Sequence, residues 1–170
     1  MICCVTGHRP QGFPFAREND QDIFKKYLEK LLDEVGLLIW KGYDLFLTGM
    51  AEGADIDFAY SVLEYQNIYP QIRLEAALSY PYQAPKRKTL YIQDKETVLQ
   101  QCSQVHVISS AYHEGCMQQR NQYMVDHADL VFAIWNGSQK GGTWNTIRYA
   151  QRIGKPIRYL LLNDLDAWNI

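Results

Sequence analysis

The chain has 170 residues, enough for one sizeable core, and we expect residues 1–170 to form a single domain. Hydrophobic residues make up 47% and charged residues 21% of the sequence, which excludes an intrinsically disordered chain. The formal net charge of −2 provides no generally basic surface for binding phosphate backbones, so the composition disfavours nucleic acid as a partner.

The sequence also lacks the marks of a membrane or exported protein. No apolar run approaches the span of a bilayer, and no basic leader with a cleavage site precedes the first apolar segment. The cysteines form no CxxC pair, and we interpret them as reduced core thiols: Cys3, Cys4, Cys102 and Cys116. We therefore expect a cytoplasmic protein with no membrane partner and no metal centre. A homo-oligomer is left open.

The first third of the chain begins with a buried strand. Ile2–Thr6 is continuously apolar, as in a strand covered on both faces, and a polar loop follows it. Apolar residues at helical spacing predict a helix over 19–40, which Asn19 or Asp20 can cap. Asp44–Thr48 is a second strand, and a glycine-containing turn leads from it into a helix over 54–66.

The middle of the chain contains a strand of a different kind. In Ile72–Leu78, Arg73 and Glu75 alternate with apolar residues, so we expect this third strand at an exposed edge of the sheet. A loop rich in proline, tyrosine and basic residues follows over 79–88. The next helix is predicted over 89–102.

The last third repeats the pattern of strand and helix. Val105–Ser109 and Leu130–Trp135 are strands, with a helix over 114–128 between them. Thr143 is expected to cap a further helix that ends at Gly154, before a sixth strand at Ile157–Leu162.

This alternation predicts an α/β fold, in which a mostly parallel six-stranded sheet carries helices on both faces as a single three-layer domain. Ligands in such sheets bind beyond the carboxyl ends of the strands, where the strand order reverses. The clusters of chemically interesting residues all follow strands: 7–10, 49–55, 109–114 and 136–143. We expect them to meet at one edge of the sheet.

The glycines at 141 and 142 precede a predicted helix. Gly141, Gly142 and Thr143 can present backbone N–H groups and a hydroxyl to a phosphate at the positive end of that helix. The alternative is an ordinary capped helix after a glycine turn.

The turn over 49–55 is a second candidate for ligand binding. Gly49 and Gly53 bracket it, but the spacing is not that of the GxGxxG dinucleotide fingerprint. Glu52 and Asp55 can accept hydrogen bonds from ribose hydroxyls or bind Mg²⁺. The alternative is that both carboxylates only stabilise the helix N-terminus.

Three basic residues complete the predicted site. His8 and Arg9, after Gly7, follow the first strand, where a guanidinium can pair with a phosphate and an imidazole can donate to it. Arg120, next to Asn121, lies on an otherwise apolar helix face, so it needs an internal carboxylate or a bound phosphate as partner. A turn made of surface polar residues is the alternative for His8 and Arg9.

Several tyrosines extend these loops. Tyr80 and Tyr82 follow the third strand, and Tyr112 follows the fourth. Their rings can stack on a base or simply pack against one another, and their role is left open.

Together these motifs resemble the YpsA-like branch of the SLOG superfamily. The resemblance is carried by Thr6-Gly7-His8-Arg9-Pro10, the turn over 48–55, the segment 116–126 around Arg120-Asn121, and Gly141-Gly142-Thr143. It implies a Rossmann-like domain that binds a nucleotide or nucleotide-derived ligand, such as a compound related to NAD or ADP-ribose. Relatives include the LOG-type phosphoribohydrolases and the DprA proteins, which bind single-stranded DNA.

The resemblance to the LOG enzymes is partial. Arg120 corresponds to their catalytic arginine and Gly141-Gly142 to their glycine pair. Their glycine turn continues into a catalytic glutamate, whereas residues 143–148 of this chain contain no acid. A carboxylate is needed to stabilise developing positive charge or activate water.

We therefore expect a sensor or regulatory domain for a phosphorylated nucleotide-like ligand. One alternative is a nucleotide hydrolase in which Arg120 acts with Glu52 or Asp55. A second is DprA-like binding of single-stranded DNA, for which the sequence offers the tyrosine-rich loop and Lys86-Arg87-Lys88.

Overall fold

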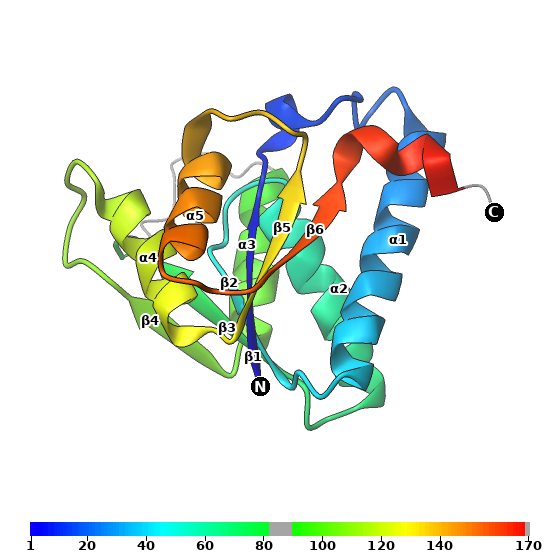
Figure 1. Cartoon of the computed structure of the whole chain (residues 1–170). Coiled ribbons are helices and arrows are strands. Elements are labelled where there is room, and N and C mark those ends of the chain that lie inside the picture. The colour runs from blue at the N-terminus through cyan, green and yellow to red at the C-terminus, as the bar shows by residue number, and fades with distance from the viewer. Residues whose placement is uncertain (82–89, 169–170) are drawn as a thin grey trace.

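The computed structural model describes residues 1–81 and 90–168, and within these ranges six strands form one sheet (Figure 1). All neighbouring strands pair in parallel, in the order β4-β3-β2-β1-β5-β6. The strands are β1 (Ile2–Gly7), β2 (Leu45–Thr48), β3 (Arg73–Leu78), β4 (Gln104–Val107), β5 (Leu130–Trp135) and β6 (Ile157–Leu161). The predicted α/β fold with a parallel sheet is confirmed.

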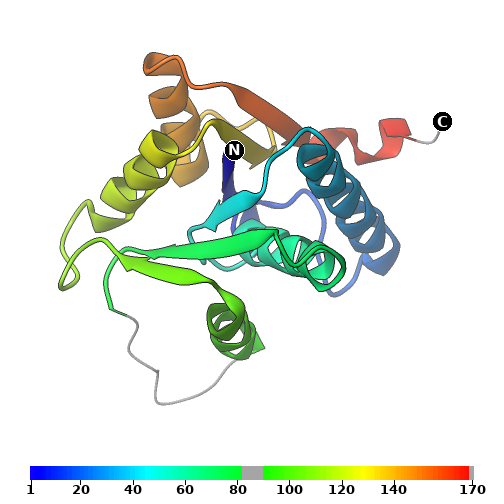
Figure 2. The same ribbon diagram turned by 90° about the horizontal axis from the view of Figure 1, so that it is seen from below.

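Helices cover both faces of this sheet. They are α1 (Gln21–Trp40), α2 (Ala54–Ile68), α3 (Leu90–Gln101), α4 (Cys116–His127) and α5 (Gly141–Arg152). Figure 2 shows α1, α2 and α3 on one side and α4 and α5 on the other, as in a Rossmann-like domain. Two short 3₁₀ segments follow strands, η1 (Pro10–Gly12) and η2 (Leu162–Trp168). No helix in the described ranges has the length and apolar character needed to span a bilayer.

Each face of the sheet has its own apolar core. Under α1, α2 and α3, the ring of Phe58 packs between Phe46 and Phe132, with centroids 5.9 and 5.8 Å away. A smaller core lies under α4 and α5. Cys3 contributes to the first core and Cys4 to the second, because adjacent residues of a strand point to opposite faces. All four cysteines are free thiols.

The prediction that the third strand lies at the edge is wrong. β3 pairs with β2 on one side and with β4 on the other, so β4 is the edge strand at this end of the sheet. Both polar residues of β3 are compatible with this inner position. Arg73 is exposed at the start of the strand, and Glu75 lies 2.8 Å from the ring of His106 on β4. The exposed side chains of Val105 and Val107 mark the true edge.

The order of the strands determines where a ligand can bind. The chain builds the sheet outward from β1 to β4 in one direction, then returns to place β5 against the other side of β1. The connections leaving β1 and β5 therefore diverge to opposite faces of the sheet. Such a reversal opens a crevice beyond the carboxyl ends of the two strands.

Candidate functional site

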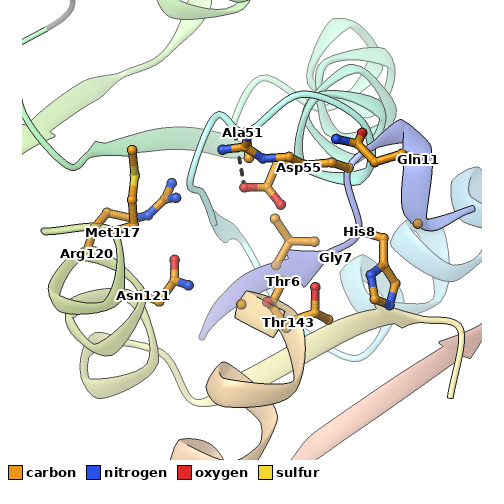
Figure 3. A pocket seen from close by; sticks show the side chains of 14 residues that line it. Thr6, Gly7, His8, Gln11, Ala51, Asp55, Met117, Arg120, Asn121 and Thr143 are labelled. Carbon is orange, nitrogen blue, oxygen red and sulfur yellow. Dashed lines mark hydrogen bonds between the residues drawn. The ribbon is translucent and has the colours of Figure 1, made fainter. Parts of the chain in front are cut away.

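A cavity of about 310 Å³ opens at this reversal (Figure 3). Its lining comes from the end of β1 and the following loop, the turn before α2, the first half of α4 and the first turn of α5. The lining residues are Val5, Thr6, Gly7, His8, Arg9, Gln11, Gly12, Ala51, Asp55, Met117, Arg120, Asn121, Gly142 and Thr143. Segments far apart in the sequence thus contribute to one site.

His8 forms one end of the cavity, across from the side chains of α4 (Figure 3). Its ring packs against the backbone of Gly12, where an added Cβ would lie 2.8 Å from the His8 Cβ. Burial lowers the pKa of His8, and a hydrogen bond with Asn136 partly opposes this effect. The buried Nε2 has no hydrogen-bond partner among the described residues. Burial therefore favours the neutral form of the His8 imidazole.

The turn between β2 and α2 has a backbone conformation that requires glycine. Gly53 adopts a φ of 94°, and a Cβ there would lie 2.7 Å from the carbonyl oxygen of His8. The N–H of Ala54 donates to that same oxygen at 3.0 Å, which attaches the start of α2 to the end of β1. Thr48 holds the other end of the turn, because its hydroxyl donates to the carbonyl of Asp55 at 3.1 Å.

Asp55 and Arg120 place opposite charges on one wall. The Asp55 carboxylate accepts a hydrogen bond from the N–H of Ala51 at 3.2 Å and faces the cavity (Figure 3). Burial raises the pKa of Asp55, and the charge of Arg120 counteracts this rise. Arg120 is itself buried, and its Nη1 donates to the carbonyls of Gly49 and Ala77. Part of its function is therefore to hold the turn after β2 in place.

The first turn of α5 closes the opposite wall. The prediction that Thr143 caps this helix is wrong: Lys140 is the N-cap residue, and the helix begins at Gly141. Thr143 is buried in the first turn and lines the cavity. The first N–H groups of a helix have no partner within the helix, so this turn offers donors and a positive dipole end to an anion.

A hydrogen-bonded chain fixes this turn against α4. The amide of Asn121 donates to the hydroxyl of Thr146 at 3.0 Å, and that hydroxyl donates to the carbonyl of Gly142 at 3.0 Å. Asn121 therefore sets the distance between the α4 wall and the α5 wall.

The other residues proposed from the sequence lie around the cavity rather than on it. Gly49 and Gly53 shape the turn behind Asp55, and Gly141 precedes the two lining residues of α5. Glu52 is exposed and lines a neighbouring cavity that also contains Tyr80. Tyr82 and Lys86-Arg87-Lys88 lie outside the described residues.

Sequence reasoning missed some of the lining. Met117 lies on the same predicted apolar face of the helix as Arg120, which favours a core position, but it is 40% exposed and forms part of the cavity wall. The helical spacing of three residues between them was the available signal. Gln11 carried no such signal, because only the 3₁₀ turn after Arg9 brings its side chain to the cavity.

The described residues include no group of three or more His, Cys, Asp or Glu side chains placed to hold a metal ion. The possible Mg²⁺ site at Glu52 and Asp55 therefore rests on these two carboxylates alone. Only Asp55 faces the cavity beyond β1 and β5, which we call the main cavity.

Comparison with known proteins supports the resemblance seen in the sequence. The model of the YspA SLOG family, YpsA, matches residues 3–165. A UPF0398 protein of Bacillus pumilus is 26% identical over 98% of this chain and 90% of its own length. An uncharacterised SPbeta prophage-derived protein of Bacillus subtilis, YoqJ, is 27% identical over 75% of this chain and 81% of its own length.

A solved structure shares the fold. It is DNA processing protein A from Helicobacter pylori, reported for its single-stranded DNA binding mode, with a TM-score of 0.58 and 18% identity over 94% of this chain. The chain spans 64% of the length of that structure. The expectation that nucleic acid is disfavoured as a partner is thereby corrected, because this fold occurs in a protein that binds single-stranded DNA. A net charge averaged over the molecule does not describe one local site.

Proposed function

Because the chain belongs to the YspA SLOG family, we propose that it binds a nucleotide or nucleotide-derived phosphorylated ligand in the cavity beyond β1 and β5. Its role would be that of a sensor or regulatory protein. The observation that carries the proposal is the composition of the walls. The first turn of α5 faces a site where two arginines, Arg9 and Arg120, outnumber the carboxylate of Asp55 among the described lining residues. Such a site favours an anion that accepts several hydrogen bonds.

The size of the cavity narrows the ligand class. Its volume of about 310 Å³ lies at the lower end of the range of roughly 300–1,000 Å³ that is typical of small-molecule sites. A ribose phosphate or the phosphorylated part of a mononucleotide suits this space. A larger compound such as NAD or ADP-ribose would extend into neighbouring space.

Substitution of Arg9 tests the proposal directly. Arg9 is exposed and lines the cavity, so Arg9→Gln removes a phosphate partner without opening the core. We expect affinity for AMP or ribose 5-phosphate, measured by calorimetry, to fall about tenfold or more, since a hydrogen bond to a charged group contributes about 1.5–3 kcal/mol.

Arg73→Gln is the matched control, because it removes the same charge from an exposed arginine at the amino-terminal end of β3. Equal losses in the two variants would contradict the assignment of Arg9. Failure of the wild-type protein to bind AMP, ribose 5-phosphate, ADP-ribose or NAD at millimolar concentration would contradict the proposal itself.

We favour binding over hydrolysis of the LOG type. The first turn of α5 contains no acid, and Glu52 lies in the neighbouring cavity. Within the described part of the chain, Asp55 is the one carboxylate that lines the main cavity, and it already accepts a hydrogen bond from Ala51. Release of a free base from AMP, abolished by Asp55→Asn, would reverse this preference.

Single-stranded DNA is the second candidate ligand. It is favoured by the fold shared with DNA processing protein A over 94% of this chain. Salt-sensitive binding of a poly-dT oligomer by the wild-type protein would support it, and no binding at low salt would exclude it.

A further inference from the structure

A second cavity, of about 620 Å³, adjoins the proposed phosphate site. It lies beyond the ends of β2 and β3 and beside α3. The two cavities share four lining residues, Arg9, Ala51, Met117 and Arg120, so they are continuous around the turn that precedes α2.

Aromatic rings give this second cavity its character. The ring of Tyr80 packs edge-on against Tyr112, with centroids 5.7 Å apart and planes at 83°. The two tyrosines belong to different loops, after β3 and after β4, and Tyr112 is 69% exposed. Because the contact is edge-on, ring surface of the pair is left for stacking on a planar group. Leu78 and Ile92 add apolar surface to the lining.

A buried hydroxyl provides a polar contact at the boundary between the cavities. The Ser79 side chain lines the second cavity, and its hydroxyl donates to the sulfur of Met117 at 2.9 Å. A thioether is a weak acceptor. A ring nitrogen or exocyclic oxygen of a ligand would be a better acceptor for this hydroxyl.

We infer that the second cavity holds the base of the nucleotide, stacked on the Tyr80–Tyr112 pair, while its phosphate occupies the first turn of α5. This inference rests on the proposed function and deepens it, because it divides the ligand between two adjoining spaces. The arginines shared by both cavities, Arg9 and Arg120, would then lie at the junction of the two spaces and contact the phosphate from the side of the ribose. The ligand would be a nucleotide rather than a simple sugar phosphate.

The test compares AMP with ribose 5-phosphate, which differ in the base. In wild-type protein, AMP should bind more tightly than ribose 5-phosphate by calorimetry. Tyr112→Ala should weaken AMP on the order of tenfold and leave ribose 5-phosphate unchanged, since one stacked base is lost. Tyr112→Phe should retain the affinity for AMP. Tyr69→Ala, which removes another exposed tyrosine at the far end of α2, should change neither.

The outcomes separate this inference from the proposed function. Equal affinity of the wild-type protein for AMP and ribose 5-phosphate, or equal weakening of both ligands by Tyr112→Ala, would overturn the base site while phosphate binding still stands. If the wild-type protein binds neither compound, the proposed function fails and the base site fails with it. Tyr112 is largely exposed, so a far-ultraviolet circular dichroism spectrum suffices to verify that its variants fold.

Discussion

Arg120 illustrates how one side chain can combine support of the fold with ligand binding. Its guanidinium faces the cavity, yet it donates to the carbonyl groups of Gly49, in the turn after β2, and of Ala77, in β3. Removing it would leave buried acceptors without their donor, at a cost of roughly 1–3 kcal/mol. Arg9 is therefore the better probe of phosphate binding, because its exposed side chain makes no hydrogen bond of this kind to the described residues.

Asp57 is another buried charge with a defined partner. Arg17 lies 2.5 Å from its carboxylate, and the hydroxyl of Tyr27 donates to it at 3.1 Å. Arg17 also lies over the ring of Phe24, 4.5 Å from its centroid. This group ties the loop before α1 to the first turn of α2, and that loop begins with the residues that line the cavity.

Asp57 predicts a specific dependence of stability on pH. Burial raises the pKa of Asp57 to about 6, although Arg17 and Tyr27 act to lower it. Between about pH 4 and pH 6 the folded protein keeps a proton that the unfolded chain has lost. This contribution to stability is fully present below about pH 4 and is lost as the pH rises through about 6.

We therefore expect the free energy of unfolding of the wild-type protein to fall, relative to that of Asp57→Asn, as the pH rises. Urea denaturation at pH 4, 5.5 and 7 measures this trend. Asp22→Asn, which changes an exposed carboxylate in the first turn of α1, should show no such trend. A difference between wild type and Asp57→Asn that stays constant with pH would contradict the raised pKa.

At the scale of elements, the site depends on where α2 and α5 begin. The start of α2 is fixed closely to β1 through the bond between Ala54 and His8, whereas α5 begins at two glycines with open space around them. A Cβ at Gly142 would have no heavy atom of the described residues, outside its own chain neighbours, within 4 Å. The two glycine turns look alike in sequence and differ in their packing.

This difference can be measured with two matched substitutions. Gly53→Ala should lower the free energy of unfolding by about 1–3 kcal/mol, because alanine is strained at positive φ and its Cβ would crowd the His8 carbonyl. Gly142→Ala should leave stability unchanged or slightly increased. Urea denaturation of both variants provides the comparison, and equal effects would show that the turn before α2 tolerates a side chain.

At the scale of the whole molecule, one sheet serves two layers of helices. Phe58 is fully buried in the larger core, and β1 contributes residues to both cores. Because both helix layers pack against the same central strands, unfolding of one layer should also unfold the other.

Phe58→Ala should therefore destabilise the molecule as a unit, by about 3–5 kcal/mol. Hydrogen exchange should show that amide protection falls together in α2, next to the substitution, and in α5, on the opposite face of the sheet. Ala59→Gly, a smaller change at a buried position of α2, should produce the same pattern with a lesser loss. Full protection of α5 in Phe58→Ala would mean that the two layers unfold independently.

The order of strands and helices could be predicted from the sequence because it depends on local pattern. The continuous apolar run of Ile2–Thr6 and the helical spacing over 19–40 are both present in the structure, as β1 and α1. The position of a strand in the sheet depends on pairing across the chain. Glu75 suggested an exposed edge because its partner, His106, lies 31 residues away.

The same distinction applies to the site. The sequence by itself determined which clusters follow strands, and a parallel sheet brings such clusters to one edge whatever their order. Only the tertiary structure decided that Asp55 faces the main cavity whereas Glu52 faces the neighbouring one. It also decided that Thr143 lines the cavity wall and does not cap the helix. The hydrogen bond from Arg120 to the Gly49 carbonyl likewise depends on packing in space. Local patterns follow from neighbours along the chain, whereas the direction and partner of a side chain follow from what packs against it in space.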